Sequence, residues 1–548
     1  MRTKKKTNKM MSNLQNEKTA MSLQDQYQDK KMNAILPARA ARPNFLLLSA
    51  MLAVSLSIFP SCTVGPKYHA PTTPAPPAYK ESPTQFKENA GWTVAQPADA
   101  KIRGKWWEMF NDPELNALEE QLDINNQNIR QFFENFMAAR AIVRETRAQY
   151  FPTLSVVPAI TRSTASSNLR SNVVTGTGTT TTTSSKAISN FSLPFEASWA
   201  PDIWGRVRNA VHQTEYAAQV SAADLENERL TEQASLAQFF FEIRGQDMLQ
   251  QIFNETVAAD QKALDLTKTL YDLGIDGQIA VVQAQTTLEA AQAGATNVGI
   301  ARAQYEHAIA MLVGKMASDF SIPVKPMTTA PPPIPIGLPS ELLQRRPDVA
   351  AAERAMAEAN AHIGVAYAAY YPNLTLTGQA GFQSSAFSSW LSWPSRFWSV
   401  GASVSQPLFD AGLRRATVQQ YVANYNANLA TYRQTVLTAF QQVEDALAQV
   451  RILSQQVQQE TAALKSAQQF LQLEQGRYET GIDPFLNVLI AQNTALADAQ
   501  TLNAIQVQEM TAAVSLVQAL GGGWDQSQLP SAGQVTAKPS GSETKIQP

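Results

Sequence analysis

Residues 374–382 read Leu-Thr-Leu-Thr-Gly-Gln-Ala-Gly-Phe, and residues 398–405 read Trp-Ser-Val-Gly-Ala-Ser-Val-Ser. In both stretches apolar or small side chains alternate with small or polar ones. Successive side chains of a β-strand point to opposite faces, so a period of two predicts strands with one apolar and one polar face. Two earlier stretches alternate in the same way. We therefore predict four strands, at about 153–163, 189–199, 373–383 and 398–408.

The length and pattern of these strands are typical of outer-membrane β-barrels, whose segments are about ten residues long. Trp390, Trp393 and Phe397 gather around the last strand pair, as aromatic side chains do at a membrane interface. Pro158 and Pro194 count against perfect ladders, because proline has no N–H to donate. Four strands cannot close a barrel, and a small polar inner face suits a wide, water-filled one. The pattern therefore predicts that several chains share one barrel.

The chain contains two copies of one unit. Tyr271-Asp-Leu-Gly-Ile-Asp276 recurs as Tyr478-Glu-Thr-Gly-Ile-Asp483 with an offset of 207. An earlier motif, at 150–154, recurs at 370–374 with an offset of 220. The difference between the two offsets means that the first copy holds 13 extra residues. These residues fall in the Ser/Thr/Gly tract at 174–185, where we expect a surface loop.

Helical patterns fill most of each copy. Residues 205–273 and 412–480 lack proline and have apolar residues at three- and four-residue spacing, which predicts two helices of roughly 100 Å. Shorter helices are expected at 114–149, 278–313, 340–370 and 485–520, and pairs of them can stack end to end beside each long helix. Helical periodicity alone also fits a soluble coiled-coil scaffold, but the strand patterns argue against it.

Charge and composition narrow the class of protein. The chain has 44 basic and 46 acidic residues, without the concentrated basic face that nucleic-acid binding needs. Residues 1–61 carry a net charge of +7 and an apolar run at 45–59, which predicts a signal peptide. The only cysteine, Cys62, follows directly and is a candidate for lipidation, an incidental small residue being the alternative.

Nothing in the sequence indicates catalysis or a cofactor. Four histidines are scattered without metal-ligand spacing, and neither a GxSxG motif nor a phosphate-binding loop occurs. We therefore expect no enzyme activity, no metal and no cofactor. The histidines are His69, His212, His307 and His362.

Three further segments resemble the signature motifs of one family. They are Cys62-Thr-Val-Gly-Pro-Lys-Tyr68, Trp106-Trp-Glu-Met-Phe-Asn-Asp-Pro-Glu-Leu115 and Leu338-Pro-Ser-Glu-Leu-Leu-Gln-Arg-Arg-Pro-Asp-Val-Ala-Ala-Ala-Glu353. They are similar to segments of the TolC-like outer membrane factors, in the NodT and OprM branch of lipoproteins. In the third motif, Pro347 suits a first helical turn and Asp348 suits the positive end of a helix.

The resemblance implies a mixed α and β membrane protein. In this family three identical chains form a 12-stranded barrel, four strands from each chain, continued by a long periplasmic α-helical barrel. It implies a lipid-anchored efflux channel in the outer membrane of a Gram-negative bacterium. Its partners would be outer-membrane lipid, a periplasmic adaptor and an inner-membrane transporter of RND type, and no nucleic acid.

These observations divide the chain into six parts. The parts are a leader at 1–61, a lipidated tether at 62–105, repeat 1 at 106–322, a Pro-rich linker at 323–339, repeat 2 at 340–524 and a flexible tail at 525–548.

The resemblance also places a periplasmic gate near the ends of the long helices. Lining positions fall at Leu486, Asn487 and Ile490, and Tyr478 matches a tyrosine that tethers neighbouring helices. Channels of the family usually have aspartate at one or both of the positions of Asn487 and Ile490. This sequence has neither, so we expect closure by apolar packing, unless Ile490 only packs between helices. The turns at Gly274 and Gly481 would contact the adaptor, and plain helix caps are the alternative.

Overall fold

The computed structural model describes residues 63–71, 75–76, 78–81, 104–164, 173–174, 180–181, 187–327, 330–335 and 339–537, all within the compact unit Thr63–Pro548. The expected signal peptide, Cys62 and most of the loop at 174–185 lie outside these residues.

One antiparallel sheet joins the two repeats. Its order is β1-β5-β6-β7, with β2 also paired to β5, so that β5 of repeat 1 lies beside β6 of repeat 2. The strands are β1 (Thr153–Val156), β2 (Ala159–Ser163), β5 (Ile188–Trp199), β6 (Asn373–Ser384) and β7 (Arg396–Ser405); a separate short pair is formed by β3 (Val173–Val174) and β4 (Thr180–Thr181).

The predicted strands differ from the observed ones in two places. The strand expected at 153–163 is divided into β1 and β2, because Pro158 has no N–H to continue the ladder. The strand expected at 398–408 ends at Ser405, two residues before Pro407. The remaining two strands match the predicted ranges to within one residue at each end.

Two helices of 67 residues each, α5 (Arg206–Asp272) and α9 (Leu413–Glu479), follow β5 and β7. At 1.5 Å per residue each is about 100 Å long. Their bounds agree with the predicted ranges to within one residue, because neither stretch contains a proline to interrupt it. Among the described residues, no helix is both long and apolar enough to cross a membrane.

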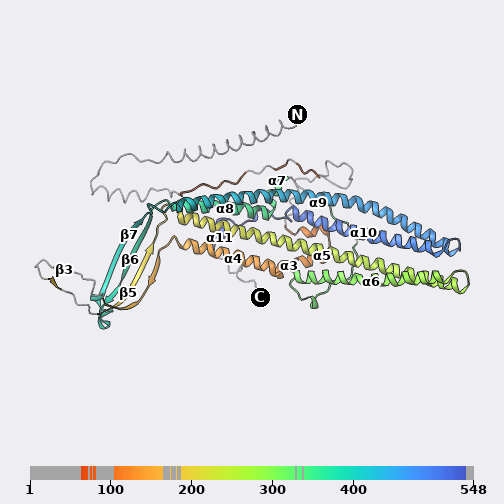
Figure 1. Ribbon diagram of the computed structural model, residues 1–548, viewed down its shortest axis with the longest axis horizontal. Coiled ribbons are helices and arrows are strands. Elements are labelled where there is room, and N and C mark those ends of the chain that lie inside the picture. Colours follow the sequence, from red (N-terminus) through yellow and green to blue (C-terminus); the bar gives the residue numbers. More distant parts are fainter. Residues whose placement is uncertain are drawn as a thin grey trace, which may run out of the picture. The chain divides into compact units, whose positions relative to one another are not determined.

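The shorter helices pack along the long ones, as Figure 1 shows. Helices α4 and α6 contact α5, while α8 and α10 contact both α5 and α9. The helix expected at 114–149 is two helices, since Asn126 ends the first and its side chain caps the second. Similarly, the helix expected at 340–370 is interrupted before Pro347. The bounds are α3 (Pro113–Asn125), α4 (Gln127–Ala148), α6 (Gln278–Leu312), α7 (Pro339–Arg345), α8 (Pro347–Ala368) and α10 (Phe485–Ala519).

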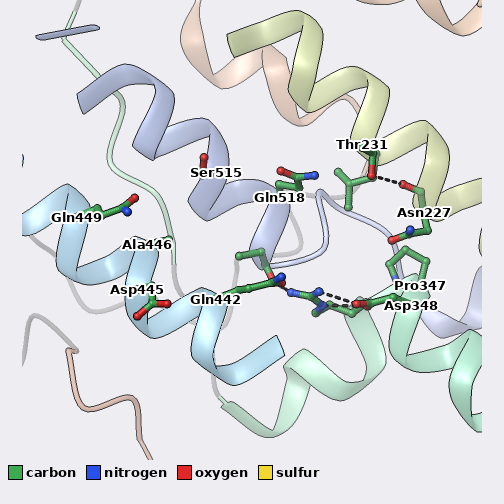
Figure 2. A pocket seen from close by; sticks show the side chains of 13 residues that line it. Asn227, Thr231, Pro347, Asp348, Gln442, Asp445, Ala446, Gln449, Ser515 and Gln518 are labelled. Carbon is green, nitrogen blue, oxygen red and sulfur yellow. Dashed lines mark hydrogen bonds and ion pairs between the residues drawn. The ribbon is translucent and has the colours of Figure 1, made fainter. Parts of the chain in front are cut away.

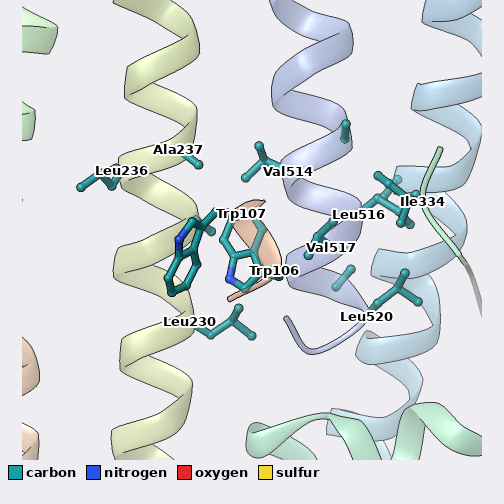
Figure 3. Packing of buried hydrophobic residues seen from close by; sticks show 14 of the residues in the cluster. Trp106, Trp107, Leu230, Leu236, Ala237, Ile334, Val514, Leu516, Val517 and Leu520 are labelled. Atoms are coloured by element: carbon teal, nitrogen blue, oxygen red, sulfur yellow. The ribbon is translucent and has the colours of Figure 1, made fainter. Parts of the chain in front are cut away.

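The main core lies between α5, α9 and α10, about halfway along the long helices. The short helix η2 (Trp106–Phe110) inserts Trp106 and Trp107 between α5 and α10, near Leu230 and Val517 (Figure 3). Both indole rings are buried, so the motif that begins at Trp106 stabilises the fold through packing. A second, smaller cluster lies at the ends of the long helices and includes Tyr478.

The flexible tail predicted at 525–548 is wrong for residues 525–537, which are packed. Helix α11 (Ala532–Thr536) begins at Ser531 with a capping box and lies against α4 and α5. Val535 is fully buried, and the Arg140 side chain donates hydrogen bonds to the carbonyls of Gln534, Val535 and Ala537. The polar composition of the segment concealed this one buried apolar contact.

Replacing Arg140 with Ala should release the C-terminal segment. The substitution leaves three carbonyls without their donor, so we expect the free energy of unfolding to fall by about 1–3 kcal/mol. Thermal unfolding and limited proteolysis near Pro530 would measure this. Arg130→Ala, at an exposed position of the same helix, is the matched control. Equal stability of the two variants would contradict the prediction.

Candidate functional site at the helix tips

Each long helix ends in a turn built around a glycine. Gly274 and Gly481 have φ of 68° and 72°, a left-handed conformation in which other residues are strained. The N–H groups of Ile275 and Ile482 donate to the carbonyls of Leu270 and Arg477, each at 2.9 Å, which satisfies carbonyls at the helix ends. Both glycines are therefore needed as helix caps. A contact with an adaptor stays a prediction.

Tyr478 links the two repeats at this end. It is buried, and its hydroxyl donates to Asp276 Oδ2 at 2.8 Å and lies 3.3 Å from Thr267 Oγ1. Its ring packs against Phe485 with a centroid distance of 5.3 Å. Burial, opposed by the Thr267 hydrogen bond and reinforced by Asp276, raises the pKa of Tyr478 to about 12. The hydroxyl therefore keeps its proton and remains a donor at neutral pH.

The two tips are not equivalent, despite the repeat. Asp483 is held by Arg477 in its own turn, and this hydrogen bond lowers the pKa of Asp483. Repeat 1 has Leu270 where repeat 2 has Arg477, so Asp276 takes its partner, Tyr478, from the other repeat. The phenolic hydroxyl therefore joins the first turn to the second, in addition to the apolar tip cluster that contains residues of both repeats.

The predicted lining residues lie on the first two turns of α10. Leu486 is 48% exposed and Ile490, one turn later, is 52% exposed. Asn487 is half-buried, whereas Val488 is buried in the tip cluster. Leu486 and Ile490 therefore share a face directed away from the core of their own chain.

The sequence predictions missed two buried polar residues near the tips. Asp260 on α5 is 2% exposed and Gln492 on α10 is 8% exposed. Within the described ranges, Asp260 Oδ2 and both amide atoms of Gln492 lack a hydrogen-bond partner. Burial raises the pKa of Asp260 from 3.8 to about 6. An acidic residue at a core position of the helical repeat was the signal that could have revealed it.

Asp260→Asn should stabilise the protein in a pH-dependent way. Because the folded-state pKa lies above the ordinary value, the carboxyl costs stability as pH rises from 3.8 through about 6. The amide cannot ionise, so the variant should melt at a higher temperature than the parent above pH 6, and this advantage should vanish at acid pH. Asp265→Asn on the exposed face is the control. An advantage that does not change with pH would refute the assignment.

The linker-to-helix motif has a structural role. Figure 2 shows the polar pocket beside it, about 460 Å³ in volume and lined by residues of α5, α8, α9 and α10. Arg346 pairs with Asp348 at 2.6 Å and donates to the carbonyl of Ala519 at 3.0 Å, which ties the start of α8 to the end of α10. The guanidinium is thus engaged by its own chain.

Across the described residues, no three His, Cys, Asp or Glu side chains gather where they could hold a metal ion.

Solved structures with this architecture include outer-membrane channels. The outer-membrane channel OprN matches 84% of this chain and all of its own, with 27% identity and a TM-score of 0.76. CusC, with 25% identity and a TM-score of 0.72, also matches 84% of this chain and all of its own. The MtrE channel of Neisseria gonorrhoeae, at 23% identity, shares the fold.

Proteins with similar sequences are likewise named as outer membrane proteins of efflux or export systems. The solvent efflux pump outer membrane protein SrpC of Pseudomonas putida is 30% identical over 86% of this chain and 98% of its own length. The pyoverdine export outer membrane protein OpmQ of Pseudomonas aeruginosa is 29% identical over 83% and 94%. The model of the outer membrane efflux protein family matches residues 118–315 and again 338–522, which confirms the internal repeat. The chain belongs to the outer membrane efflux protein family.

Proposed function

We propose that three copies of this chain form the outer-membrane channel of a tripartite efflux pump. In such a pump an inner-membrane transporter, of RND type by resemblance, supplies the energy, and a periplasmic adaptor connects it to the channel. The chain itself would be a passive conduit for small toxic compounds and would catalyse no reaction.

The unpaired strand edges at the two sides of the sheet support this proposal. The sheet ends at β1 and β2 on one side and at β7 on the other. Helix α4 precedes β1 and α9 follows β7, so each open strand edge is continued by an edge helix. Unpaired edges attract further strands, and one edge can pair with the opposite edge of the next copy. Such head-to-tail contacts form a closed ring when the rotation between copies divides a full turn evenly.

The sheet also has a face suited to lipid. Val400, Val404 and Trp398 alternate along β7, and each is at least two-thirds exposed. An antiparallel sheet in water would cover such a face. In a barrel formed by several copies this face would contact the hydrocarbon of the outer membrane, and the alternate small residues would line the pore.

The proposed lipid anchor at Cys62 predicts the result of one labelling experiment. Cys62→Ala should abolish incorporation of a palmitate analogue, because the chain has no other thiol. Heat-resistant trimers should still form, since the sheet itself would span the membrane. Undiminished labelling of the variant would exclude this anchor.

The gate would close by apolar packing. Three copies of Leu486 and of Ile490 would meet at the pore axis, and neither residue carries a charge that could hold water or ions there. Narrow apolar constrictions exclude water and so block ions. The bond from Tyr478 to Asp276 would hold the hairpin that carries these residues against its neighbour.

Planar-bilayer recordings test the function and the gate together. The parent should form trimers that conduct little, Tyr478→Phe and Leu486→Ala should raise single-channel conductance, and Ile490→Asp should add cation selectivity and block by trivalent cations. Leu473→Ala, at an exposed site on α9, is a control outside the constriction. If all three gate variants match the parent, the constriction lies elsewhere. If purified trimers never conduct, the proposed channel function is wrong.

A further inference from the structure

Two arginines at equivalent positions of the two repeats each hold an extended segment against a long helix. Arg244 and Arg451 are separated by the repeat offset of 207, and each lies 38 residues after the first residue of its helix. Both therefore lie about 57 Å from the sheet end of their helices.

The first of these clamps is buried. Arg244 is 3% exposed and donates to the carbonyl of Pro323 at 2.8 Å, and its guanidinium pairs with Glu114. One turn later, Asp247 accepts from Arg302 of α6 at 2.7 Å and from the Lys325 N–H at 2.9 Å. The start of the linker between the repeats is thus fixed across α5 and α6.

The second clamp holds the segment that follows Cys62, which we call the N-terminal strap (residues 63–71 and 78–81). At its far end, Glu444 of α9 accepts the N–H groups of Lys80 and Glu81 at 2.7 and 3.0 Å. Arg451 pairs with the Glu81 carboxylate at 2.8 Å. Both partners of this ion pair are about one-fifth exposed, so this clamp is less enclosed than the first.

The strap has little slack. At its near end, Val64 donates to the carbonyl of Trp204, and Thr63 accepts from Arg208 at the start of α5. Glu444 lies 31 residues into α9, about 47 Å from the helix start. The 18 Cα-to-Cα steps from Thr63 to Glu81 span at most about 60 Å. Midway, Tyr68 donates to Glu353 of α8 at 2.5 Å. The strap therefore restrains α9 up to Arg451.

Burial changes at the level of the two clamps. On α9 the last buried residue of the main core is Val450, and beyond it only Ala467 and Tyr478 are buried. Helix α5, flanked by α6 and α10 of the same chain, shows the same change: after Asp247 only Asp260, Leu264 and Thr267 are buried. The tip cluster is separate from the main core. Regions of a protein with few buried contacts open locally at a low free-energy cost.

We propose that the Arg244 and Arg451 clamps set the pivot about which the two hairpins bend when the gate opens, and that the strap acts as a brace on the α9 side of this pivot. The proposal rests on the gate described above. The tether at Tyr478 and the clamp at Arg451 lie at opposite ends of the same helical segment, so weakening either one favours opening.

The strap clamp can be tested because it is partly exposed. Arg451→Ala should assemble as heat-resistant trimers and raise the open probability in bilayers by roughly two- to fivefold per chain, the effect of one partly exposed ion pair. Glu444→Ala removes the acceptor of the Lys80 and Glu81 N–H groups and should change the open probability in the same direction. The conductance of the fully open state should not change, because the pore lining is intact. Gln456→Ala, at an exposed site five residues beyond Arg451, should behave like the parent.

A charge exchange separates a specific brace from general loosening. Arg451→Glu alone should raise the open probability, and combining it with Glu81→Arg should restore the parent value. The brace is wrong if the clamp variants gate like the parent while Tyr478→Phe opens, or if the exchange fails to restore gating in trimers of parental melting temperature. A parent that forms no channel would instead refute the proposed function.

Discussion

A five-stranded sheet with two open edges governs the rest of this molecule. Unpaired N–H and C=O groups along β1, β2 and β7 must find partners, and in a membrane no water can supply them. Only a few residues connect α4 to β1 and β7 to α9, so the helices inherit the order of the strands. Closing the barrel would therefore also close the helical tunnel, without a separate docking step.

Much of this architecture can be predicted from the sequence, because it depends on local periodicity. Both 67-residue helices were predicted to within one residue, since proline-free segments with a clear helical repeat have few alternatives. The predicted helix and strand bounds were wrong where a single residue interrupts a periodic pattern. Asn126 divides a helix by capping the next one, and Pro158 divides a strand.

Contacts between distant residues could not be predicted in this way. Tyr478 and Asp276 are 202 residues apart, and both belong to a motif that occurs in each repeat. The repeat suggests that the two turns form the same contacts. They do not, because repeat 1 has Leu270 at the position of Arg477 in repeat 2. Similarly, the residues that hold the strap to α9 are separated by more than 360 positions, and nothing in the sequence around Glu81 indicates its partner.

The hydrogen bond from Tyr478 to Asp276, the proposed lock of the gate, lies within one polypeptide, so every copy carries its own. In an assembly of several copies, each copy forms this hydrogen bond independently of its neighbours. In a cell that makes two versions of the chain, mixed assemblies would contain one or two unlocked copies. Under the proposed gate, a version without this hydrogen bond would act dominantly, because it would weaken closure in every assembly that contains it.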